Sequence, residues 1–107
     1  MATCSLLAFP LPLIPIADRL LLKISAVVPV HVFGLPAKII KIKEICSNWG
    51  LPLIEDAAEA LGSRVLEDNQ KIHCGCFGDL GAISFNGNKI ITSGSGGAVI
   101  TLSLIHI

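Results

Sequence analysis

The chain has 107 residues, of which 52% are hydrophobic and 15% are charged, and its formal net charge is zero. This length allows one small domain at most, and the sequence has no basic stripe of the kind that a nucleic-acid-binding surface needs, so we expect no nucleic-acid partner. So few charges are typical of strands buried on both faces of a parallel sheet, and we expect a central piece of a larger α/β protein.

The first 23 residues are set apart from the rest of the chain. Residues 6–16 are apolar but contain prolines, and the run is shorter than the roughly 20 apolar residues of a spanning helix. The first basic residue is Arg19, whereas a signal peptide carries its positive charge early. We expect a non-native start and no membrane partner; a signal peptide or anchor is the alternative.

Residues 25–32 are apolar and β-branched and predict a buried strand that ends before Gly34. Pro29 is unsuited to a central strand, so this strand is expected to begin late or to lie near an edge. A helix is then predicted from Pro36 to a C-cap at Gly50. Its apolar face is expected to consist of Ile39, Ile42, Ile45, Cys46 and Trp49.

Residues 51–54 predict a second short strand, which completes a parallel strand–helix–strand unit. Open α/β sheets bind ligands beyond the carboxyl ends of their strands. Asp56 lies just past this strand, so its position alone places it in a candidate site.

The remaining elements are expected to be short. Residues 57–61 predict a helical turn, and two short strands on either side of residues 67–70 predict a hairpin. Two further strands are predicted at residues 81–85 and 97–101, joined by a loop that carries Lys89. Gly87 in this loop is expected to adopt a positive φ.

The four cysteines are expected to be free thiols in a reducing cytoplasm. The stretch from His73 to Cys76 contains three candidate metal ligands. A zinc site usually needs four ligands at separated spacings, and no second Cys/His pair lies nearby in sequence, so we expect no metal site.

Lys89 follows a short apolar strand and precedes a Gly/Ser-rich turn and another strand, as a lysine that forms a Schiff base would. Asp56 offers the acidic partner that a pyridine-ring cofactor needs. Together they indicate pyridoxal-phosphate chemistry. The alternatives are a solvated loop lysine and an aspartate that caps a helix.

Four segments in order, residues 29–37, 50–62, 77–89 and 96–101, resemble the DegT/StrS family of pyridoxal-phosphate-dependent sugar aminotransferases. The resemblance implies an α/β fold, namely the central part of the large domain of fold-type I enzymes, with a mostly parallel sheet and flanking helices. It implies a cytoplasmic homodimer. It also implies transfer of an amino group from glutamate to a keto group of a nucleotide-linked deoxy sugar, in amino-sugar and cell-surface polysaccharide biosynthesis.

The resemblance also implies roles for individual residues. Lys89 would bind the cofactor covalently and move a proton, and Asp56 would hold the proton on the pyridine nitrogen. Glu59 would contact the cofactor or assist proton transfer; an exposed helix glutamate is the alternative. Ser84 would bind the cofactor phosphate; a strand hydroxyl with a structural partner is the alternative.

The resemblance covers residues 24–101, a partial cofactor-binding domain, and we expect residues 102–107 to be a non-native tail. Further phosphate-binding and substrate-binding parts of the family lie outside this chain, so we expect it to be inactive by itself. Two alternatives remain. One is a dehydratase of the same family, although such relatives carry histidine in place of Lys89. The other is a non-catalytic α/β remnant or binding module.

Overall fold

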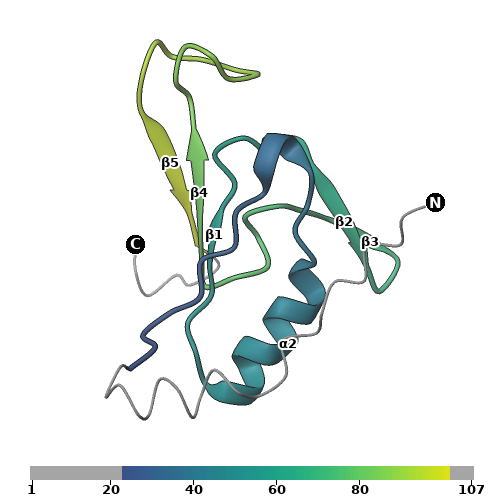
Figure 1. Cartoon of the computed structure of the whole chain (residues 1–107). Coiled ribbons are helices and arrows are strands. Elements are labelled where there is room, and N and C mark those ends of the chain that lie inside the picture. Colours follow the sequence, from purple (N-terminus) through teal and green to yellow (C-terminus); the bar gives the residue numbers. More distant parts are fainter. Residues whose placement is uncertain (1–22, 102–107) are drawn as a thin grey trace, which may run out of the picture.

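Figure 1 shows the computed structural model of the chain, which describes residues 23–101. The two terminal segments considered above, residues 1–23 and 102–107, lie outside this range except for Lys23. In chain order the elements are the 3₁₀ turn η1 (Val32–Gly34), helix α2 (Ile39–Trp49) and strands β1 (Ile54–Asp56), β2 (Arg64–Glu67), β3 (Gln70–His73), β4 (Leu80–Ser84) and β5 (Gly97–Ile100).

The main sheet has the strand order β1-β4-β5, and the expected α/β class is confirmed. Strands β1 and β4 are parallel, with Asp56 opposite Ala82. Strands β4 and β5 are antiparallel, with Ser84 opposite Gly97. This second pair is antiparallel because one loop joins the two strands directly, whereas a parallel pair needs a crossover connection.

Residues 25–32 do not form the continuous strand predicted for them. They contact β1 and the residue before it through two isolated parallel bridges, Val27 to Leu53 and Val30 to Asp56. Pro29 has no N–H group to donate, although its carbonyl accepts a hydrogen bond from Asp56 N at 2.9 Å. The segment therefore lies beside β1 at the edge of the described sheet, one of the two places that Pro29 predicted, and the missing N–H at Pro29 falls between its two bridges.

Helix α2 begins at Ile39, three residues later than predicted, and ends at Gly50 as predicted. Gly50 has the left-handed φ of 61°, and its N–H donates to the carbonyls of Cys46 and Ser47. The later start has a local cause, because the N–H of Ala37 donates to a ring nitrogen of His31 and is held away from the helix.

The buried face of α2 is narrower than the predicted one. Ile39 and Cys46 are buried and Ile42 is partly buried, but Ile45 and Trp49 are 55% and 50% exposed. Successive helical residues are rotated by about 100°, so Ile45 lies well around the axis from the line that joins Ile39 to Cys46. Ile45 and Trp49, which were predicted to belong to the apolar face, therefore lie outside the buried cluster of the described residues.

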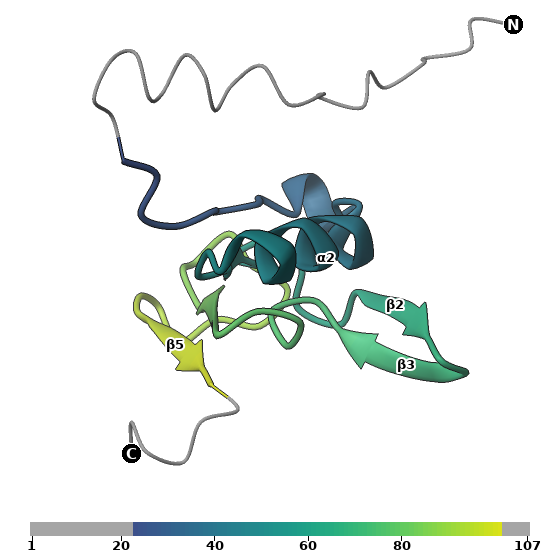
Figure 2. The same ribbon diagram turned by 90° about the horizontal axis from the view of Figure 1, so that it is seen from below.

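Two small hydrophobic clusters hold the elements together. One joins α2 to the start of β1 through Ile39, Cys46, Leu53 and Phe77, and the other is built on Ala57, Ala60, Cys74 and Ile83. Figures 1 and 2 show β5 and the β2–β3 hairpin on opposite sides of α2.

None of the helices described between residues 23 and 101 is long and apolar enough to cross a membrane.

The predicted β2–β3 hairpin is confirmed. Its two turn residues, Asp68 and Asn69, have φ values of 47° and 62°, which is the pattern of a tight hairpin turn that aspartate and asparagine tolerate. Residues 57–61 form hydrogen-bonded turns instead of the predicted helical turn. Here the side chain of Asp56 accepts from Ala58 N, and such local bonds compete with helix formation.

Gly81 generates the first prediction, because a Cβ atom there would lie 2.0 Å from the carbonyl oxygen of Gly75. Gly81→Ala should lower the free energy of unfolding by about 1–3 kcal/mol through overpacking. Gly87→Ala is the matched control, since its Cβ would meet nothing closer than 3.9 Å. Urea denaturation of both variants tests this, and equal stability of the two would contradict the packing seen here.

Candidate functional site

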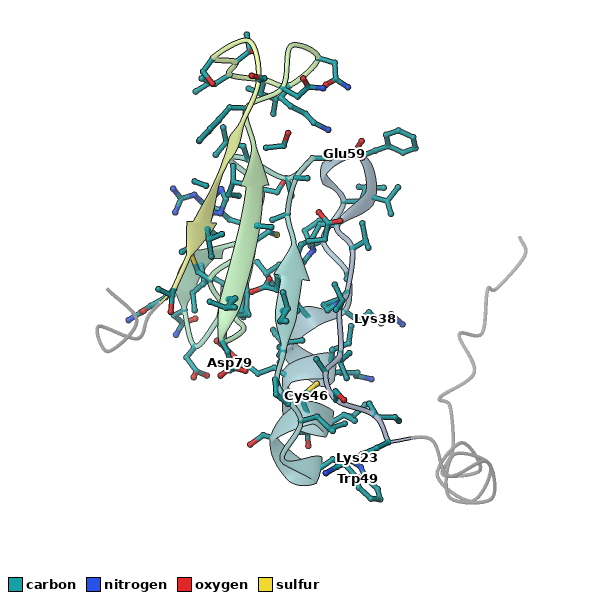
Figure 3. The ribbon with its side chains drawn as sticks, turned by 90° about the vertical axis from the view of Figure 1, so that its left-hand side faces the viewer. Lys23, Lys38, Cys46, Trp49, Glu59 and Asp79 are labelled. Carbon is teal, nitrogen blue, oxygen red and sulfur yellow. The ribbon has the colours of Figure 1, made fainter. Side chains whose placement is uncertain are left out.

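The parallel pair β1 and β4 ends at one edge of the sheet, and the candidate site lies there. Asp56 is the last residue of β1, and Ser84 is the last residue of β4. The loop from residue 85 to residue 96 follows β4 and carries Lys89. Figure 3 shows Glu59 at this end of the sheet and Asp79 at the opposite end.

A cavity of ≈ 380 Å³ opens at this edge, and Phe33, Glu59, Ser84, Asn88 and Lys89 are among the residues that line it. The structure therefore brings together three of the four predicted site residues. Asp56, the fourth, is not among the lining residues.

Lys89 and Glu59 face each other across the cavity. Lys89 Nζ lies 3.6 Å from Glu59 Oε1, and the two side chains are 17% and 39% exposed. The other carboxylate oxygen of Glu59 accepts a hydrogen bond from Phe33 N at 2.8 Å. Glu59 is thus held at both oxygens, and it lies on a turn rather than on the exposed helix considered as its alternative.

The loop that carries Lys89 is anchored at Phe85. The N–H of Phe85 donates to Gly96 O at 2.9 Å, and its carbonyl accepts from Ser93 N at 3.1 Å. Lys89 N donates to Asn86 O at 3.0 Å, a turn whose central residues do not need positive φ. The expected positive φ of Gly87 is accordingly wrong; in this loop Gly94 and Gly96 adopt it instead.

Asp56 and Ser84 each have a local hydrogen bond. Asp56 Oδ1 accepts from Ala58 N at 3.1 Å, a capping bond of the kind foreseen as the alternative, although it caps a turn and not a helix. Within residues 23–101, no side-chain bond is made by Asp56 Oδ2. Ser84 Oγ accepts from Asn86 N at 3.3 Å, which leaves its hydroxyl hydrogen available to a ligand.

Glu55 is the residue that sequence reasoning missed. It is completely buried and points to the opposite face of β1 from Asp56, because successive side chains of a strand alternate. Its Oε1 accepts from Phe77 N at 2.6 Å and Gly78 N at 2.8 Å, and its Oε2 accepts from Gly75 N at 2.9 Å. The available signal in the sequence was an acidic residue directly after an apolar run and before Asp56.

His31 completes this buried group. Its Nε2 lies 2.9 Å from Glu55 Oε2, and its Nδ1 accepts from Ala37 N at 3.1 Å. Because Nδ1 is an acceptor, the proton lies on Nε2, which donates to Glu55. The histidine thus connects β1 to the segment that leads into α2.

Cys46, Cys74 and Cys76 are free thiols, as predicted, and Cys4 lies outside the described residues. Burial raises the pKa of all three thiols, and the negative charge of Glu55 further raises the pKa of Cys74 and Cys76. Raised pKa values keep these thiols protonated and poorly nucleophilic near neutral pH. They are therefore not candidates for covalent catalysis.

The stretch from His73 to Cys76 does not have the geometry of a metal centre. His73 Nε2 accepts from Gly62 N at 2.7 Å, and Nδ1 bonds to the carbonyl of Cys74, so both ring nitrogens are engaged by the backbone. No group of three or more metal-ligating side chains gathers anywhere in the described part of the chain.

Comparison with known proteins agrees with this architecture. At the sequence level, the chain is 46% identical over 85 residues to GDP-perosamine synthase of Vibrio cholerae, covering 79% of this chain and 22% of that protein. It is also 46% identical over 77 residues to the putative pyridoxal phosphate-dependent aminotransferase EpsN of Bacillus subtilis strain 168, covering 72% and 19%.

Among solved structures, a DegT DnrJ EryC1 StrS aminotransferase from Brucella abortus superposes with a TM-score of 0.75 at 37% identity, covering 86% of this chain and 24% of that one. Residues 16–103 match the DegT/DnrJ/EryC1/StrS aminotransferase family, and the chain belongs to this family. It spans about a fifth of the length of the curated relatives it matches.

The buried carboxylate of Glu55 generates the second prediction. Glu55→Gln should destabilise the chain by about 1–3 kcal/mol, because an amide nitrogen cannot accept and at least one buried N–H loses its acceptor. Glu44→Gln on the exposed side of α2 should change the stability little. Urea denaturation compares the two variants, and a Glu55→Gln variant as stable as the parent chain would overturn the bonding described here.

Proposed function

We propose that this chain forms the cofactor-binding part of a pyridoxal-phosphate-dependent aminotransferase. The enzyme would transfer an amino group from glutamate to a keto group of a nucleotide-linked deoxy sugar, in amino-sugar and cell-surface polysaccharide biosynthesis. Membership of the aminotransferase family and the similarity to a GDP-perosamine synthase support this proposal. The observation that carries it is the amine of Lys89 in a cavity beside Ser84 and Glu59.

The residues of the cavity fit this cofactor. Lys89 offers a primary amine for its aldehyde group, and Ser84 offers a hydroxyl donor for its phosphate. The volume of ≈ 380 Å³ lies within the range of pockets for small molecules. When bound, pyridoxal phosphate supplies an electron sink that stabilises negative charge at the substrate carbon.

Each residue has a separate task in this proposal. Lys89 Nζ would hold the cofactor, and as an amine it could move a proton at the substrate carbon. Asp56 does not line the cavity itself, but it ends the strand next to β4 and its Oδ2 is unengaged by its neighbours, so it would hold a proton on the pyridine nitrogen. Ser84 Oγ donates to the phosphate, and Glu59 orients the amine of Lys89 through their contact of 3.6 Å.

The identity of residue 89 distinguishes transamination from dehydration. A lysine amine can both bind the cofactor covalently and return a proton, whereas the family's dehydratases carry histidine at this position. Lys89 therefore favours the aminotransferase. As in the rest of the family, the complete enzyme is proposed to be a cytoplasmic homodimer.

The third prediction tests the cofactor. The chain is incubated with pyridoxal phosphate, reduced with borohydride and digested, and the cofactor mass is expected on the peptide that contains Lys89. Lys89→Ala should remove this label, while Lys38→Ala at an exposed lysine should keep it. Mass spectrometry provides the measurement. Equal labelling of several lysines, unaffected by Lys89→Ala, would contradict the proposed function.

A further inference from the structure

The bonded pair of His31 and Glu55 lies where the segment that contributes Phe33 to the cavity begins. His31 is completely buried, and three bonds fix it: its ring contacts Glu55 and Ala37, and its backbone N–H donates to Asp56 O at 3.0 Å. Both the ring and the main chain are therefore held against β1. The turn η1 begins at the next residue.

The hydrogen bonds of the turn η1 fix the backbone of Phe33. Gly34 N donates to His31 O at 3.4 Å, and the hydroxyl of Ser63 donates to Gly34 O at 2.7 Å. Between these two bonds Phe33 takes a φ of 52°, an unfavourable value for a bulky residue that persists only where its surroundings impose it. In this conformation the Phe33 N–H points at Glu59 Oε2, 2.8 Å away.

Glu59 needs such a constraint. Its side chain is 39% exposed, and an exposed ion pair gains little when both partners must give up their rotational freedom. Of the residues that line the cavity, Glu59 and Lys89 are the charged ones. The Phe33 N–H holds one oxygen of Glu59, which directs the other oxygen towards Lys89.

We infer that His31 and Glu55 are positioning residues that act through the Phe33 N–H to hold the Glu59 carboxylate, and through it the Lys89 amine, in the cavity. The inference rests on the proposed function for its catalytic meaning. This series of hydrogen bonds starts at the buried carboxylate on one face of β1 and ends at the cavity. Neither positioning residue needs to touch a ligand.

The test compares His31→Asn with His31→Gln. Asparagine can place an acceptor near the position of Nδ1 but loses the donor to Glu55, whereas glutamine can place a donor near the position of Nε2. Two readouts are measured without cofactor. One is hydrogen exchange of the Phe33 amide relative to the Ala57 amide, which donates within the sheet to Ala82 O at 3.0 Å. The other is acetylation of Lys89 by an N-hydroxysuccinimide ester, relative to exposed Lys38.

In the His31→Asn variant, exchange of the Phe33 amide should accelerate about fivefold relative to that of Ala57, the change that corresponds to loss of an ordinary hydrogen bond. Acetylation of Lys89 relative to Lys38 should rise towards the ratio found for Glu59→Gln. In the His31→Gln variant both readouts should return towards those of the parent chain.

A purely structural role for His31 predicts different results. Exchange at Phe33 and Ala57 would then accelerate together, with the Lys89 ratio unchanged, and this outcome would overturn the inference. If His31→Asn abolishes the protection of Ala57, Ser63→Ala provides the test, since it loosens η1 without altering the buried pair. An unchanged Lys89 ratio in that variant, with faster exchange at Phe33, would likewise overturn it.

These readouts separate the inference from the proposed function. Acetylation and exchange report on the residues themselves, whereas borohydride trapping reports on the cofactor. Loss of trapping at Lys89 with the expected changes in both ratios would reject the cofactor and retain the positioning. Trapping at Lys89 with both ratios unchanged would retain the cofactor and reject the positioning.

Discussion

The carboxylate of Glu55 is the constraint on which the arrangement of this chain depends. A charge that is removed from water must be compensated by hydrogen bonds or opposite charge. Here Gly75, Phe77 and Gly78 donate their backbone N–H groups and His31 donates its ring N–H. The Glu55 side chain thus holds both the loop before β4 and the segment before α2 against β1. Alternation along the strand then places Asp56 on the opposite face.

Satisfying a carboxylate with backbone donors requires the chain to approach closely, and glycine makes this approach possible. Gly75 has a φ of 95°, and a Cβ at Gly78 would lie 2.5 Å from the carbonyl oxygen of Leu53. Gly81, opposite Glu55 in the parallel pair, leaves room for the carbonyl of Gly75. The glycines of this region and the buried glutamate therefore depend on each other. Because the glycines have no side chain, the loop can approach closely enough to donate its backbone N–H groups to the carboxylate.

Sequence patterns predicted the features that local signals determine. Gly50 ends the helix and Asp68–Asn69 turns the hairpin because their own backbone preferences decide the outcome. The bond between His31 and Glu55 joins residues 24 positions apart, and no local pattern specifies such a partner. The resemblance of the motifs to a family predicted that Lys89 and its neighbours share one site. It could not show which contacts hold them there.

The charge of the cavity limits how the proposed cofactor can be bound. The charged residues that line it are Lys89 and Glu59, which cancel each other, whereas a phosphate group brings roughly −1.5 to −2 charges near neutral pH. The described lining therefore cannot balance a phosphate by opposite charge. Among the described lining residues, Ser84 offers a neutral donor, at the end of β4 beside the loop that carries Lys89. The proposed role of Glu59 is accordingly to orient the amine of Lys89, which it contacts at 3.6 Å, since its own charge would oppose an anion that approached it.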